Sequence, residues 1–138
     1  MRQLLKEYRL GDMAVRYETD EKRHVGLTLY PADKPLSTVE KQAALDSLVQ
    51  LKLAGDAAEG CYAQGNTMRN SASVQNMRYV SQNTKEDAFG IEIVTILADS
   101  RGYEVHHHLY WKREMPYISV FCEFHNHGQD PAQLELLS

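Results

Sequence analysis

The strongest structural signal in the sequence is the stretch Tyr103–Phe124, which reads YEVHHHLYWKREMPYISVFCEF. Apolar and polar residues alternate on both sides of KREMP, and this period of two is typical of β-strands. The sequence therefore predicts a β-hairpin of Tyr103–Lys112 and Tyr117–His127. We place Lys112 opposite Tyr117, because KREMP fits a short connection.

This register divides the hairpin into two faces. The first is apolar except for one histidine and carries Val105, His107, Leu109, Trp111, Ile118, Val120, Cys122 and Phe124. The second carries Glu104, His106, His108, Tyr110, Ser119, Phe121, Glu123 and His125. Imidazole and carboxylate groups are common ligands of divalent metals, so His106, His108 and Glu123 are candidate metal ligands. The alternative is a polar sheet surface with cross-strand His–Glu pairs, and His107 is interpreted as a hydrogen-bonded core histidine.

The rest of the chain indicates an all-β protein. Period-two runs predict strands at Met13–Tyr17, Val25–Tyr30, Leu48–Leu53, Met77–Ser81, Ile91–Leu97 and Ala132–Leu136. Val39–Leu45 suits either a helical turn or a loop. Ala54–Val74 is rich in Gly, Asn and Ser and is predicted to be a long irregular loop. This spacing is typical of an antiparallel β-sandwich, and 138 residues are enough for a single domain over residues 1–138.

Composition narrows the possible partners and location. The net charge is −4 without a Lys/Arg run, so we expect neither nucleic acid nor a membrane as partner. The chain lacks an apolar stretch of about 18 residues and the apolar core of a signal peptide. Cys61 and Cys122 lack the spacing of a metal motif and are interpreted as reduced thiols. We therefore expect a cytoplasmic protein without a cofactor.

The chain contains no nucleophile elbow, phosphate-binding glycine loop or HExxH motif, so no catalytic residue is assigned to it. The loop Gly60–Ala72 instead concentrates donors and acceptors that suit sugar hydroxyls. The candidate substrate-binding residues are Tyr62, which offers a stacking face, together with Gln64, Asn66, Arg69 and Asn70. The alternative is a hydrogen-bonded structural loop between sheets.

An ordered series of stretches across residues 46–138 carries a family resemblance. They are DSLVQLKLAGD (46–56), YAQGNTMRNS (62–71), MRYVSQ (77–82), EIVTILAD (92–99), RGYEVHHHLYW (101–111) and FHNHG (124–128). In this order they resemble the N-terminal domain of glycoside hydrolase family 36, the α-galactosidase (melibiase) family. Arg69 matches an arginine of the Asp-Phe-Arg stretch of several relatives, whereas Thr67 and Met68 replace its Asp and Phe.

The resemblance implies a β-supersandwich that is similar to galactose mutarotase-like folds. It also implies packing against a catalytic (β/α)8 barrel, contacts between copies in a homo-oligomer, and a loop that helps to shape a galactoside site. The family's catalytic Asp residues belong to the barrel, so no residue of this chain inherits their roles. Because the family domain is considerably longer, we interpret the chain as a fragment of one.

The expected function is therefore that of a non-catalytic accessory domain of an α-galactosidase-like glycoside hydrolase. Such a domain would contact a galactoside-type oligosaccharide only as part of the parent enzyme. Three alternatives stay open: an independent carbohydrate-binding module, a metal-binding β-domain that uses His106, His108 and Glu123, and a purely structural β-domain.

Overall fold

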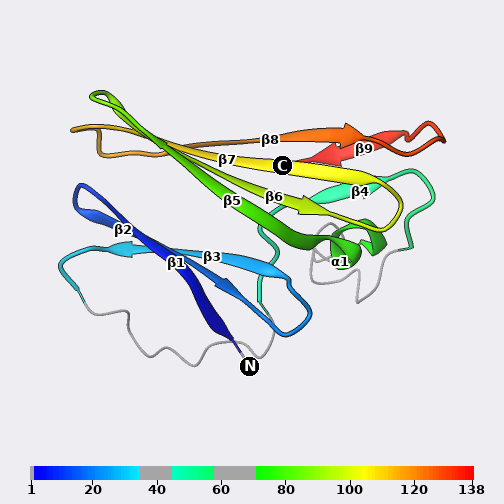
Figure 1. Ribbon diagram of the computed structural model, residues 1–138, viewed down its shortest axis with the longest axis horizontal. Helices are drawn as coiled ribbons and strands as arrows, with labels where there is room; N and C mark the ends of the chain where they lie inside the picture. The colour runs from blue at the N-terminus through cyan, green and yellow to red at the C-terminus, as the bar shows by residue number, and fades with distance from the viewer. Residues whose placement is uncertain (1, 35–44, 58–70) are drawn as a thin grey trace.

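The computed structural model describes residues 2–34, 45–57 and 71–138, and these are almost entirely antiparallel β-structure (Figure 1). Strands β1 to β9 form three sheets, and α1 (Ala72–Asn76) is a short helix. The expected all-β, sandwich-like fold class is thereby confirmed. Among the described residues, no helix has both the length and the apolar character needed to cross a membrane.

The first sheet is an antiparallel meander of β1 (Gln3–Leu10), β2 (Met13–Thr19) and β3 (Val25–Pro31). The turn between β1 and β2 places Gly11 at a φ of 67°, a conformation that costs glycine little. A Cβ atom at this position would lie 3.1 Å from Cζ2 of Trp111, in the large sheet. Glycine thus permits both the turn and its close approach to the other layer.

The large sheet contains four strands, each paired with its neighbour in the sequence: β5 (Arg78–Glu86), β6 (Gly90–Ala98), β7 (Tyr103–Lys112) and β8 (Ser119–Asn126). Along β6 and β7, buried residues recur at every second position, as in Ile91, Ile93, Val105 and Leu109. This pattern follows from the strand geometry, since successive side chains point to opposite faces and one face meets the core.

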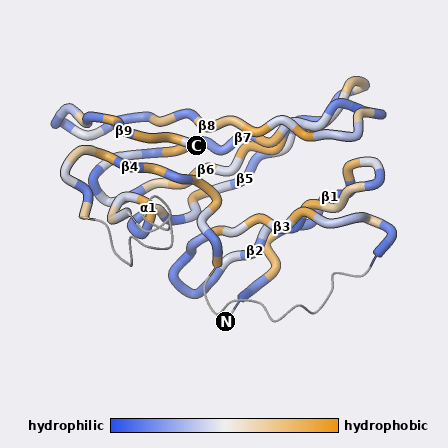
Figure 2. Tube along the Cα trace, turned by 180° about the vertical axis from the view of Figure 1, so that it is seen from behind, coloured by the Kyte–Doolittle hydropathy of each residue, from blue (hydrophilic) through white to orange (hydrophobic). Residues whose placement is uncertain are grey.

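The two larger sheets pack face to face around one core (Figure 1). Val15 and Tyr17 of β2 belong to the same buried cluster as Ile93 of β6 and Leu109 of β7. Removing such side chains from water contributes about 25 cal/mol per Å² of apolar surface, the main favourable contribution to folding. Figure 2 shows hydrophobic residues concentrated along β4 and β6.

A smaller sheet completes the structure. It pairs β4 (Leu51–Leu53) with β9 (Leu134–Leu137) in antiparallel fashion, and α1 lies next to β4. Ser71 is the N-cap of α1, because its Oγ accepts a hydrogen bond from the Val74 N–H at 3.1 Å. The same hydroxyl donates to the Leu51 carbonyl oxygen, which ties α1 to β4.

Some predicted boundaries are wrong. β8 begins at Ser119, so the expected pair of Lys112 and Tyr117 lies outside the β7–β8 ladder. From Tyr110 and Ser119 onward, however, the ladder has the predicted register. The run Leu48–Leu53 is a strand only over β4, because the residues before it form bends and coil. The last strand is shifted from Ala132–Leu136 to β9.

Two elements were missed. β1 escapes the period-two pattern because charged residues interrupt its apolar positions, and most of its side chains are exposed or half-buried. α1 begins inside the predicted irregular loop Ala54–Val74, so that interpretation is wrong from Ala72 onward. Nearly all of Val39–Leu45 and most of the loop lie outside the described residues.

Candidate metal centre

The outer face of the large sheet, turned away from β1–β3, carries a cluster of histidine and glutamate side chains. β7 positions His106 and His108 two residues apart, and the ladder with β8 places Glu123 opposite His106. Because the side-chain period of a strand is two, all three project from the same face. The predicted grouping of these residues is therefore confirmed.

The potential ligand atoms of the three residues lie close together. His108 Nε2 is 3.4 Å from Glu123 Oε2, and His106 Nδ1 is 3.8 Å from the same oxygen. One atom from each residue lies within 4.8 Å of the other two. Both imidazoles are half-buried, whereas Glu123 is exposed. Two imidazoles and one carboxylate in this arrangement could hold a divalent metal ion.

The second nitrogen of each imidazole is hydrogen-bonded to a carboxylate. His106 Nε2 lies 2.5 Å from Glu104 Oε1, and His108 Nδ1 lies 2.9 Å from Glu92 Oε1. An ionised carboxylate only accepts, so the ring nitrogen is the donor in both pairs. In the neutral form of each imidazole, this leaves His106 Nδ1 and His108 Nε2 with free lone pairs on the side of Glu123.

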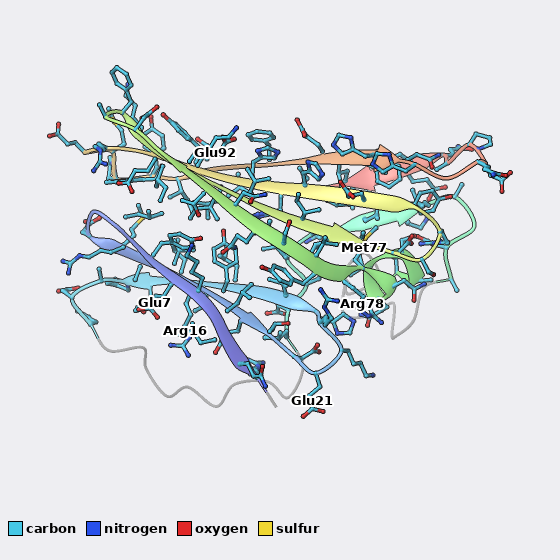
Figure 3. All side chains as sticks on the ribbon, in the orientation of Figure 1. Glu7, Arg16, Glu21, Met77, Arg78 and Glu92 are labelled. Carbon is cyan, nitrogen blue, oxygen red and sulfur yellow. The ribbon has the colours of Figure 1, made fainter. Side chains whose placement is uncertain are left out.

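Glu92 also belongs to this cluster, although the sequence did not predict it. It belongs to β6, and Figure 3 shows it on the side of the large sheet that faces away from β1–β3. Its contact with His108 depends on β6 lying beside β7, with Val94 opposite His108. The register of the β6–β7 hairpin would have revealed it, since Glu92 is then the diagonal neighbour of His108 on that face.

Aromatic contacts restrain the rings. Phe121 stacks on His108 with the ring centroids 4.3 Å apart and the planes at 9°. The ring of His125 lies 4.4 Å from that of His106, and its Nε2 is 3.4 Å from Glu123 Oε2. His108 Nε2 and His125 Nε2 are both buried and make no hydrogen bond among the described residues.

The electrostatics of the cluster favour an ionised Glu123. Desolvation by itself would raise the pKa of this carboxyl group. The attraction of the imidazoles of His125 and His108 in their protonated form outweighs that effect, so the pKa lies below its usual value. Glu123 is thus a carboxylate at neutral pH, the form that binds metal ions.

The inner face of the same hairpin behaves differently. His107 is only 3% exposed, and burial lowers its pKa to about 4, so it is neutral at pH 7. It is the predicted core histidine, but its Nδ1 makes no hydrogen bond among the described residues. Opposite it, Cys122 is a free, half-buried thiol whose pKa is raised by burial.

The predicted sugar-binding residues belong to a segment that the structure does not describe. Residues 58–70 lie outside the described part of the chain. They include Tyr62, Gln64, Asn66, Arg69 and Asn70, as well as Cys61. The sugar site therefore stays a prediction from the sequence.

Comparison of the chain with known protein families, with characterised proteins and with solved structures gives no match. The resemblance to glycoside hydrolase family 36 thus stays a prediction that rests on the stretches quoted above.

Proposed function

We propose that the chain is a non-catalytic accessory domain of an α-galactosidase-like glycoside hydrolase. In this role it supports the catalytic barrel, takes part in oligomer contacts and helps to shape the galactoside site. Two observations support the proposal: the ordered resemblance across residues 46–138, and an apolar sheet edge that none of the described strands covers. The second is the structural observation that carries the proposal.

The uncovered edge is β8. This strand pairs with β7 on one side and is an outer strand of the described sheet. Val120 and Phe121 point to opposite faces of β8, yet they are 50% and 49% exposed. Tyr117, just before β8, is exposed as well. Soluble proteins usually cover or blunt such an edge, because its free backbone groups and apolar side chains invite pairing.

The buried core ends between β7 and β8, as Val120 and its partner on β7 show. Val120 lies opposite Leu109 on the inner face, and Leu109 is completely buried. On β8, one strand further out, the side chain of Val120 on the same face is half exposed to solvent. A protein surface packed over β8 would complete this layer. We propose that the rest of the parent enzyme provides that surface.

The test uses an α-galactosidase of this family from which its own N-terminal domain has been deleted. The purified chain is added, and both binding and melibiose hydrolysis are followed. We expect the chain alone to be inactive and to bind galactose, melibiose and raffinose no more tightly than the millimolar range. We expect it to bind the truncated enzyme and to raise its activity, because the uncovered edge becomes buried.

Variants test whether β8 is the contact. Val120→Lys and Phe121→Lys introduce charges on the two faces of β8 and should abolish binding. Leu29→Lys on β3 is the matched control, since Leu29 is 48% exposed and lies in the other sheet. Melibiose turnover by the chain alone would contradict the proposal. Saturable galactoside binding by the chain alone that Arg69→Ala removes would instead indicate an independent carbohydrate-binding module.

A further inference from the structure

We propose that His106, His108 and Glu123 bind one divalent transition-metal ion, Zn²⁺ being the ion that this donor set suits. The ion would lie on the outer face of the large sheet and connect β7 to β8. The metal site requires neither a sugar nor a catalytic barrel. A negative result in the zinc test would therefore leave the proposed function untouched.

The spacing of the ligand atoms favours a metal ion. Zinc–nitrogen and zinc–oxygen bonds are about 2.0–2.1 Å long, so neighbouring ligand atoms of a tetrahedral site are roughly 3.3 Å apart. The nitrogens of His108 and His106 lie 3.4 and 3.8 Å from Glu123 Oε2. These distances exceed those of ordinary hydrogen bonds, about 2.7–3.2 Å. Two of the three separations are therefore close to those of ligand atoms around a tetrahedral ion, and the third is within 4.8 Å, so a small approach of the two imidazoles would complete the set.

The orientation of the two imidazole rings also favours a metal ion. A metal-binding histidine typically donates its other ring N–H to a carboxylate, which fixes the tautomer and makes the ligand nitrogen more basic. Both histidines have such a partner, Glu104 for His106 and Glu92 for His108. Two independent carboxylate–histidine pairs thus point their free nitrogens toward the same oxygen of Glu123.

One of the ligand atoms is buried without a hydrogen-bond partner among the described residues. His108 Nε2 is inaccessible to solvent and makes no hydrogen bond among the described residues. A buried polar atom in this state costs roughly 1–3 kcal/mol. A metal ion between His108 and Glu123 would satisfy this lone pair. The stacked ring of Phe121 holds the imidazole in that orientation.

The donor set selects the class of metal. Ca²⁺ and Mg²⁺ prefer oxygen ligands, whereas imidazole suits Zn²⁺ and its neighbours in the first transition row. Glu92 and Glu104 add negative charge behind the two imidazoles, which further favours a cation. Three protein ligands leave the remaining coordination to water, and His125 lies beside the set as a neighbour.

The test is a zinc titration of the whole chain after treatment with a chelator. Calorimetry and competition with a chromophoric chelator should give one Zn²⁺ per chain with a Kd in the micromolar range or tighter. Mg²⁺ and Ca²⁺ should not compete. Co²⁺ should give visible absorption bands that report nitrogen ligation. Saturating Zn²⁺ should raise the melting temperature by about 5–10 °C, since only the folded state holds the site.

Four variants separate ligation from general effects on the fold. His108→Ala and Glu123→Gln remove ligands and should abolish stoichiometric binding. Glu92→Gln leaves all three ligands in place and should weaken binding by about 10–100-fold. His127→Ala is the control, because His127 is an exposed histidine that stacks on His125, outside the ligand group. Circular dichroism of each metal-free variant verifies folding.

Several outcomes would overturn the proposal. One is the absence of saturable Zn²⁺ binding to the wild-type chain. Another is one-to-one binding that survives in both folded His108→Ala and folded Glu123→Gln. Equal losses in His127→Ala and His108→Ala would indicate non-specific binding to surface histidines. Tight binding with unchanged affinity in Glu92→Gln would show that Glu92 does not orient His108 for a metal ion, and would overturn the proposed role of the carboxylate–histidine pairs.

Discussion

Three consecutive histidines of β7 occupy two different environments. His107 points into the core, is almost completely buried and lies opposite Cys122. His106 and His108 point outward, and each forms a hydrogen bond with a carboxylate. The residue type is the same at all three positions, so the difference arises from the alternation of side chains along one strand.

The comparison shows that each face of one hairpin has its own chemistry. On the inner face, packing dominates, and the imidazole of His107 loses its ability to take a proton in the usual pH range. On the outer face, charges and hydrogen bonds dominate, and Glu123 stays ionised. Substitutions on the two faces should therefore differ in size and in their response to pH and metal.

The largest difference is expected from adjacent residues of β7. Leu109→Ala should lower the free energy of unfolding by about 2–5 kcal/mol, because Leu109 is completely buried and its truncation leaves a cavity. Tyr110→Ala, on the outer face, should cost about 1 kcal/mol or less. Urea unfolding at pH 7 in the presence of a chelator measures both. Equal losses would mean that the two faces are not distinct.

The second prediction concerns the pH dependence that His107 imposes. Its pKa is about 4 when folded and 6.5 ordinarily, so the unfolded state takes up the proton first as the pH falls. The corresponding stability is present above pH 6.5 and is lost as the pH falls toward 4, in total about 3 kcal/mol.

His107→Leu should remove this dependence. Between pH 7 and pH 5 the wild type should lose about 2 kcal/mol more than the variant does. Unfolding curves of both proteins at the two pH values give this difference. The contributions of titratable groups that both proteins contain cancel in it. A parallel pH dependence of the two proteins would show that His107 protonates normally in the folded state.

The smallest effect is expected on the outer face without metal. His106→Ala should cost roughly 0.2–1 kcal/mol in chelator-treated protein, the usual contribution of a partly exposed pair in a sheet. With Zn²⁺ present the cost should increase, because the wild type then gains the free energy of binding. Thermal unfolding with and without Zn²⁺ measures the change, and a cost that is independent of Zn²⁺ would argue against ligation by His106.

The sequence predicts the β7–β8 hairpin and its faces well, because alternation is a local property that spans many residues. It fails where the signal is short or mixed. α1 has five residues within a Gly- and Ser-rich region, and its Ser71 cap is visible only once the helix is known. β1 carries charges at positions that a strong strand pattern would leave apolar. Its place in the sheet depends on pairing with β2.

By itself, the sequence determined that the chain is all-β and that His106, His108 and Glu123 share a face, while His107 belongs to the core. Both follow from the period of two and from one antiparallel register. Only the tertiary structure decided which nitrogen each imidazole presents and that Glu92 of β6 positions His108. Strand order and side-chain rotamers are set by packing between segments distant in the sequence, and no local pattern records them.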